Sequence, residues 1–136
     1  MSLNDEERQI MVRLEYEKAE RFFTQADRNA EIKEWDVVAN RIYYSVFHAV
    51  VALLIHDQRK VGTHRGAVMM FGQYYVRTGI FSADMGRLYS QLQTMREKAD
   101  YSCDWSCTED VIMPMKEKAR HMLLSIKDYI NDLMQD

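Results

Sequence analysis

The sequence contains very few residues that make turns. Among its 136 residues there are one proline and five glycines. An all-β fold needs many tight turns, and these two residue types form a large share of them. Their scarcity argues against an all-β architecture and in favour of helices.

Long apolar runs are also missing. The longest one, Ala49 to Ile55, has seven residues, whereas a membrane-spanning helix needs about 20. The N-terminus lacks the basic and then apolar pattern of a secretory signal. We therefore expect no membrane segment and a cytoplasmic location.

Cysteine is scarce as well. Cys103 and Cys107 are the two cysteines, and a cytoplasmic location favours reduced thiols. A structural zinc site requires four ligands, and no second Cys or His pair accompanies them. The sequence also lacks a glycine-rich phosphate loop and the nucleophile elbow of serine hydrolases. These absences predict a protein without a bound metal or cofactor.

Charge is distributed unevenly, although the net charge is only −3. Residues 37–100 carry eight basic and four acidic side chains, whereas the segments before and after them are both acidic. A basic region between acidic flanks favours an anionic partner at that region. The alternative is that these charges cover solvated helix faces and bind no ligand.

Apolar residues recur at spacings of three and four along the chain, which is the period of amphipathic helices. Acids at residues 5–7 mark one helix start, and Thr63 and Ser82 are expected to cap two others. The second helix is apolar around most of its circumference, so it should lie at the centre. Short connections predict an all-α antiparallel bundle that forms one domain over residues 1–136. The five expected helices cover residues 5–30, 34–57, 63–79, 82–100 and 108 onward.

Pro114 falls inside the expected last helix. A proline in a helix interior removes one hydrogen bond, whereas the first helical position tolerates it. The helix therefore either begins near Met113 or kinks at Pro114.

The apolar second helix carries a polar stripe of four side chains. Arg41 and His48 are seven residues apart, almost two turns, so they project from one face with Tyr44 between them. Asn40 lies beside Arg41. Arginine is rarely buried without acceptors for its five donors. The stripe is either an anion pocket, in which a guanidinium holds phosphate and an imidazole exchanges protons, or an internal salt bridge to an acid on the first or last helix.

Two further sets of residues could bind an anion. The first lies at the start of the third helix, where main-chain amides attract anions, and the second lies near the end of the fourth helix. For each set the alternative is structural: an exposed helix start for the first, and capping with an arginine–aspartate pair for the second. The residues are Thr63, His64 and Arg65 in the first set, and Arg96, Asp100 and Tyr101 in the second.

Residues 39–49, ANRIYYSVFHA, resemble the NRxYYxxFHA helix of the HEPN superfamily, whose name stands for higher eukaryotes and prokaryotes nucleotide-binding. Three further segments agree in order: residues 63–66 (THRG), Phe71 with residues 76–79 (VRTG), and Arg96 followed by Asp100 and Tyr101. The resemblance covers about residues 8–133. It implies a helical bundle, usually a homodimer, that often partners a minimal nucleotidyltransferase. Many members are metal-independent endoribonucleases.

In those endoribonucleases the resemblance implies a signature of arginine, four to six residues, then histidine, often with a tyrosine two positions further on. The corresponding position here is Arg96 followed by Tyr101, and a tyrosine with a pKa of about 10 is a weak base at neutral pH. Arg41 and His48 satisfy the spacing on the second helix instead. The arginine and histidine would assist attack of a ribose 2′-hydroxyl on the adjacent phosphate.

Three functions are compatible with these residues. The first is a module that binds a nucleotide or RNA phosphate and partners a nucleotidyltransferase in a toxin–antitoxin-like or defence system. The second is a metal-independent endoribonuclease toxin. The third is a structural oligomer without a ligand. Pairing of both Arg41 and Arg96 with carboxylates would support this function. The candidate catalytic residues are Arg96, Tyr101, His48 and Arg41, and the candidate ligand-binding residues are Asn40, Tyr44, His64, Arg65 and Asp100.

Overall fold

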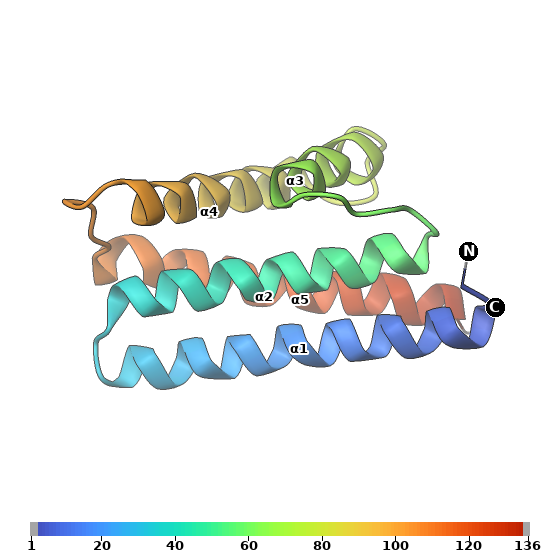
Figure 1. Cartoon of the computed structure of the whole chain (residues 1–136), viewed down its shortest axis with the longest axis horizontal. Helices are drawn as coiled ribbons and strands as arrows, with labels where there is room; N and C mark the ends of the chain where they lie inside the picture. Colours follow the sequence, from blue (N-terminus) through green and yellow to red (C-terminus); the bar gives the residue numbers. More distant parts are fainter. Residues whose placement is uncertain (1–2, 135–136) are drawn as a thin grey trace.

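The computed structural model describes residues 3–134, and within this range it contains helices and connections but no strand. The elements are α1 (Asp5–Glu31), α2 (Trp35–His56), α3 (His64–Phe71), the π-helical turn η1 (Gly72–Val76), α4 (Ala83–Tyr101) and α5 (Glu109–Met134). α1 and α2 form an antiparallel hairpin, α4 runs antiparallel to α2, and α5 runs antiparallel to α4 (Figure 1). The predicted all-α antiparallel bundle is confirmed.

α1 begins with a capping box. Asn4 Oδ1 accepts a hydrogen bond from the backbone amide of Glu7 (2.8 Å), and Glu7 Oε1 accepts one from the amide of Asn4 (3.4 Å). Ala19 and Ala26 are fully buried, so small side chains at these positions let α1 approach α2 closely. Ser45 Oγ of α2 donates to the carbonyl oxygen of Ala19 (2.7 Å), which joins the two helices at mid-length.

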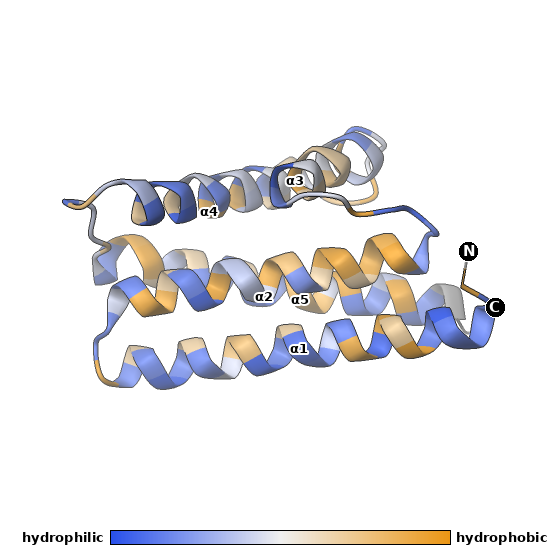
Figure 2. Cartoon of the chain, viewed as in Figure 1, coloured by the Kyte–Doolittle hydropathy of each residue, from blue (hydrophilic) through white to orange (hydrophobic). Residues whose placement is uncertain are grey.

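α2 is the central helix, as its apolar circumference predicts. It contacts α1, α3, α4 and α5, and half of its residues are buried. Figure 2 shows that apolar residues dominate α2, whereas α1 and α4 present many hydrophilic residues. By length and composition alone α2 could cross a membrane, but 61% of its most apolar stretch is buried among the other helices, as in the core helix of a bundle.

The polar stripe of α2 lies in the seam between α1 and α4, which is the strip of α2 surface left between these two helices. α1 and α4 both pack on α2, but their backbones do not contact each other within residues 3–134. Side chains from both helices reach the seam: Gln25 of α1 bonds to Arg41, and Arg96 of α4 bonds to Tyr44. The seam is therefore where polar groups of three helices meet.

The third expected helix, residues 63–79, is divided in the structure. Thr63 caps α3 as predicted, because its Oγ1 accepts from the amide of Gly66 (2.8 Å). α3 ends at Phe71, and the chain then widens into η1, where the amide of Arg77 bonds to the carbonyl oxygen of Gly72 (2.9 Å). Glycine is a weak helix former, and the widened turn keeps both Phe71 and Tyr75 buried.

α5 begins at Glu109 and passes through Pro114, so a start near Met113 is wrong. The carbonyl oxygen of Thr108 accepts from the amides of Val111 (3.2 Å) and Ile112 (3.0 Å), which sets the first turn. Ile112 is fully buried, and its packing favours the earlier start. The proline removes one backbone hydrogen bond of the helix, but Pro114 is exposed, so water can satisfy the carbonyl group left without a partner.

A partly buried carboxylate, Asp57, lies at the C-terminal end of α2. Asp57 Oδ2 accepts hydrogen bonds from the hydroxyls of Tyr75 in η1 (2.6 Å) and Tyr129 in α5 (2.9 Å). Its Oδ1 lies 2.8 Å from His56 Nδ1. Burial, together with the hydrogen bond to Asp57, raises the pKa of Tyr129 to about 12. Asp57 thus ties α2, η1 and α5 together.

Replacing Asp57 with alanine should lower the free energy of unfolding by about 2–3 kcal/mol, because two tyrosine hydroxyls lose a charged acceptor. Chemical denaturation followed by circular dichroism would measure this loss. The matched control is Asp128→Ala, which removes an exposed carboxylate of α5 and should change stability by less than about 0.5 kcal/mol. Equal effects of the two substitutions would show that Asp57 does not hold this end of the bundle.

Candidate functional site

Tyr44 is the centre of the site. Its ring centroid lies 6.0 Å from the guanidinium carbon of Arg41 and 5.7 Å from that of Arg96. The imidazole of His64 meets it edge to face, with 5.9 Å between ring centroids. One aromatic ring therefore has side chains from α2, α3 and α4 around it. The structure thus brings Arg41 and Arg96, which lie over 50 positions apart in the chain, to the same tyrosine.

Arg41 is hydrogen-bonded to neutral acceptors. Its Nε and Nη2 donate to Asn40 Oδ1 (3.1 and 2.8 Å), and its Nη1 donates to Gln25 Oε1 of α1 (3.1 Å). The guanidinium also lies over the ring of Phe22, 5.0 Å from its centroid. Among the described residues no carboxylate forms an ion pair with Arg41. The side chain is therefore held in place without being neutralised.

Arg96 reaches the site from α4. Its Nε donates to the hydroxyl of Tyr44 (3.2 Å), and its guanidinium carbon lies 5.4 Å from the ring centroid of Tyr43. Its ion pair with Asp100 is long, with 3.9 Å between Nε and Oδ2, and the Asp100 side chain is 50% exposed. Such a partly solvated pair contributes little. Most of the positive charge of Arg96 thus stays available to another anion.

His48 lies at the other end of the stripe, against α1. Its Nδ1 is 2.7 Å from Glu15 Oε2. The imidazole packs between the rings of Phe22 and Phe47, with centroid distances of 5.4 and 5.1 Å. Of the four candidate side chains on α2, His48 is the one paired with an acid of the first helix.

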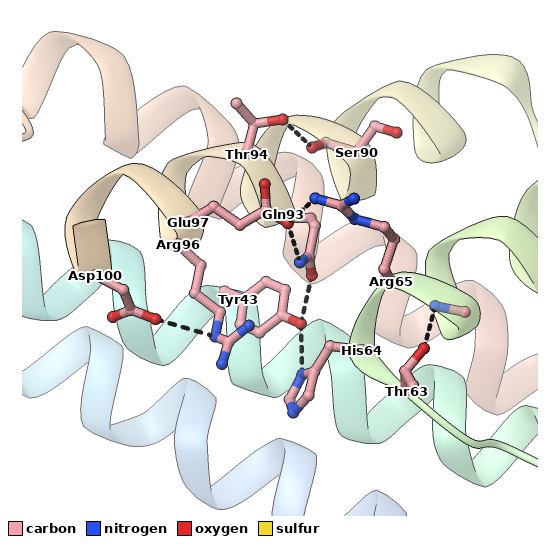
Figure 3. Close-up of polar contacts among 11 residues, drawn as sticks. Tyr43, Thr63, His64, Arg65, Ser90, Gln93, Thr94, Arg96, Glu97 and Asp100 are labelled. Atoms are coloured by element: carbon pink, nitrogen blue, oxygen red, sulfur yellow. Dashed lines mark hydrogen bonds and ion pairs between the residues drawn. The ribbon is translucent and has the colours of Figure 1, made fainter. Parts of the chain in front are cut away.

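His64 ends a chain of hydrogen bonds that starts at the protein surface. Arg65 Nη2 donates to Glu97 Oε1 (2.8 Å), and Gln93 Nε2 donates to the same oxygen (3.1 Å). The hydroxyl of Tyr43 donates to Gln93 Oε1 (2.7 Å) and lies 2.7 Å from His64 Nδ1. Figure 3 shows this chain running from α4 to the start of α3, with Arg96 beside it.

The surroundings of His64 disfavour its protonated form. Partial burial lowers its pKa below the usual 6.5, and the positive charge of Arg96 and the nearby His48 lower it further. The imidazole stacks on Phe47 with 4.2 Å between ring centroids, which shields one of its faces. At neutral pH this histidine is an uncharged imidazole beside a guanidinium.

The candidate residues at the ends of the site lie in different surroundings. Tyr101 is the last residue of α4 and is 88% exposed, so it does not lie among the aromatic groups around Arg96. Asn40, Arg96 and Trp105 line a small pocket between α2 and α4. A larger groove, of about 660 Å³, lies between α1 and α5 and is lined by residues such as Tyr16 and Lys127, but it holds none of the candidate residues.

Several members of the site were not recognised from the sequence: Glu15, Gln25, Tyr43, Gln93 and Trp105. Tyr43 lies on the apolar circumference of α2, which predicts a core position, and it is indeed buried. Gln93 is 7% exposed and falls next to the apolar stripe of α4. A buried amide needs hydrogen-bond partners, so its place beside this stripe was the one sign in the sequence that Gln93 belongs to a polar network. Within the described residues no three His, Cys, Asp or Glu side chains come together to hold a metal ion.

The fold and the site define an all-helical bundle whose central helix presents arginine, tyrosine and histidine in a seam between two other helices. Residues 12–129 match the HEPN domain family, so the chain belongs to that family. A protein of Methanocaldococcus jannaschii named "Putative toxin MJ0605" is 31% identical over 71% of this chain and 65% of its own length. The chain thus spans about two thirds of that relative.

Two further relatives cover similar shares. A "UPF0332 protein" of Thermotoga maritima is 31% identical over 69% of this chain and 71% of its own length. A second protein of Methanocaldococcus jannaschii, "Putative toxin MJ0142", is 25% identical over 84% of this chain and 78% of its own length. The resemblance to HEPN proteins that the motifs indicated is confirmed by these matches.

The lowered pKa of His64 predicts how its substitution changes the pH dependence of stability. The unfolded chain takes up a proton at this residue near pH 6.5, before the folded protein does, so His64 reduces the free energy of unfolding as pH falls from about 7 to 5. His64→Gln should make this decline shallower. Urea denaturation at a series of pH values would measure it. His121→Gln, at an exposed position of α5, is the control, and an equal change in both variants would contradict the assignment.

Proposed function

We propose that this protein binds the phosphate backbone of single-stranded RNA at the seam between α1 and α4. The observation that carries the proposal is the pair of guanidiniums, Arg41 and Arg96, 6.0 and 5.7 Å from the ring centroid of Tyr44. Arg41 has neutral acceptors, and the ion pair of Arg96 with Asp100 is long and half exposed. Arginine forms paired hydrogen bonds with phosphate oxygens. Both arginines lie in the basic segment 37–100 of an otherwise acidic chain, which gives an anion one preferred place to bind.

The aromatic groups around the arginines favour RNA over a simple anion. Phe22 and Tyr44 lie beside Arg41, and Trp105 lines the pocket beside Arg96. Unpaired bases stack on aromatic rings while basic side chains follow the backbone, and this combination is typical of single-strand binding. Two relatives carry the word toxin in their names, which agrees with a toxin-like role for this chain.

Metal-independent cleavage of the bound RNA is a second candidate function. It is favoured by the two imidazoles, His48 and His64, in the same site as the two guanidiniums. Transfer of a phosphoryl group within RNA requires a base for the 2′-hydroxyl and positive charge for the phosphate. The candidate pair of Arg96 and Tyr101 is less suited, because Tyr101 is 88% exposed at the helix end.

The nucleotidyltransferase partner and the homodimer that the family resemblance implies also belong to this proposal. Copurification of the chain with a nucleotidyltransferase encoded beside it would test the first, and sedimentation equilibrium of the isolated chain would test the second. In a toxin–antitoxin-like pair, such a partner would act to control the RNA site.

Replacing Arg41 or Arg96 with glutamine should weaken the binding of a short, fluorescein-labelled single-stranded RNA by about tenfold at low salt. Each substitution should also flatten the slope of log affinity against log salt concentration by about 0.7, the value for one lost phosphate contact on a single strand. Fluorescence anisotropy over a salt series measures both quantities.

The matched control for RNA binding is Arg13→Gln. Arg13 is an arginine of α1 whose side chain is 66% exposed and lies outside the seam, so its loss should leave both quantities nearly unchanged. Thermal unfolding of all variants shows whether the fold is kept. Equal weakening by Arg13→Gln would locate RNA binding elsewhere on the surface and refute the proposed site.

The proposed cleavage should proceed in the presence of EDTA and leave a 2′,3′-cyclic phosphate and a 5′-hydroxyl. The substrate control is the same oligonucleotide with 2′-O-methyl groups, which has no 2′-hydroxyl to attack the phosphate and should stay intact. Gel electrophoresis of labelled RNA with mass spectrometry of the products measures both. Breakage of the methylated oligonucleotide would exclude this chemistry.

A further inference from the structure

Hydrogen bonding determines which nitrogen of His64 carries its proton. The chain of hydrogen bonds begins at Glu97, whose pKa is lowered by hydrogen bonds from Arg65 and Gln93. An ionised carboxylate can only accept, so the amide nitrogen of Gln93 must face Glu97, at 3.1 Å. This fixes the amide orientation of Gln93 and places its Oε1 toward Tyr43.

The remaining two links follow from the first. The amide oxygen of Gln93 can only accept, so the single hydroxyl proton of Tyr43 is donated to it over 2.7 Å. Tyr43 then has only lone pairs to offer His64 Nδ1, which lies 2.7 Å away. Nδ1 must therefore carry a hydrogen, and the neutral imidazole has its free lone pair on Nε2.

We propose that His64 is the base of this site: Tyr43 holds its Nδ1–H, and its Nε2 is left as the proton acceptor beside Arg96. This role rests on the second candidate function, the cleavage of RNA. The family resemblance directs attention to the end of α4, where Tyr101 stands. The structure instead places an imidazole from the start of α3 against the ring of Tyr44, with 5.9 Å between ring centroids. The hydroxyl of the same tyrosine accepts a hydrogen bond from Arg96.

The groups that face His64 keep Nε2 free at neutral pH. From α2 these are Tyr43, Tyr44 and His48, the last of which is paired with Glu15 of α1. From α4 they are Arg96, whose charge opposes protonation of the imidazole, and Glu97, whose charge is engaged by Arg65. Burial acts in the same direction as Arg96.

The proposed cleavage transfers the phosphoryl group from the 5′-oxygen to the 2′-oxygen. The 2′-hydroxyl of the bound ribose gives its proton to His64 Nε2, and its oxygen forms a bond to phosphorus. The bond between phosphorus and the 5′-oxygen breaks, and that oxygen leaves with the electron pair and takes a proton from water. His64 then returns its proton to the solvent. Arg96 would hold the phosphate oxygens on which negative charge builds up.

The first test measures the tautomer directly. Long-range 1H–15N NMR spectra of protein labelled at histidine distinguish a protonated Nδ1 from a protonated Nε2, and His64→Gln assigns the signal of His64 by its disappearance. In the wild-type protein at pH 7.5 we expect Nδ1–H and a bare Nε2. A wild-type spectrum with the proton on Nε2 would overturn the proposal, whatever the protein does with RNA.

Two variants change the tautomer in different ways. Gln93→Leu removes the acceptor of Tyr43, which frees the hydroxyl to donate to Nδ1 and should move the imidazole proton to Nε2. Tyr43→Phe removes the acceptor of Nδ1–H and should abolish the tautomer preference. The matched control is Tyr16→Phe, which deletes another hydroxyl hydrogen bond, to the carbonyl oxygen of Leu123 (2.7 Å), and should leave the His64 signals unchanged. An unchanged tautomer in both site variants would refute the proposed role of Tyr43.

The second test separates the base from the RNA site. His64→Gln should lower the rate of RNA cleavage by about 100-fold or more, while its RNA affinity stays close to that of the wild-type protein. The wild-type rate should rise with pH through the pKa of His64 measured by NMR. Wild-type binding without cleavage, or cleavage by His64→Gln at the wild-type rate, would overturn the base role but leave the binding site standing. If the wild-type protein does not bind RNA, the proposed binding site is refuted. The NMR result would still decide the tautomer of His64.

Discussion

The rest of the structure depends on one constraint: α2 must be buried on nearly every side while it also carries arginine and histidine. Water cannot reach most of its circumference, so the polar groups of α2 must either find partners or point into a seam. α1 and α4 leave such a seam between them. Tyr44 lies there with two arginines near its ring, and the acceptors of Arg41 come from α1 and from its own neighbour.

Most of the fold follows from local patterns. The apolar period predicts all five helices, and Thr63 and Ser82 accept the expected amide hydrogen bonds where they begin α3 and α4. The errors occur where packing opposes local preference. Gly72 opens a π-helical turn inside an expected helix. Of the two alternatives at Pro114, the start near Met113 is the wrong one, because α5 begins at Glu109 with Ile112 fully buried.

The candidate site was predictable only as far as helical spacing reaches. Arg41, Tyr44 and His48 fall on one face of a single helix, and that face is visible in the sequence. The approach of His64 and Arg96 to the ring of Tyr44 depends on how α3 and α4 pack on α2. The spacing of apolar residues along the chain does not specify this packing. Tyr43 and Gln93 were missed for a related reason: an aromatic residue and an amide beside apolar stripes look like core until their hydrogen bonds are known.

The acceptors of Arg41 have a consequence for the way a ligand would bind. Two side-chain amides, Asn40 and Gln25, already fix the rotamer of this arginine. An arriving anion therefore does not have to immobilise a freely rotating side chain, and it displaces no competing carboxylate from it. The loss of conformational entropy that usually opposes association is reduced in advance. Affinity at this seam would then depend more on the shape of the ligand than on its total charge.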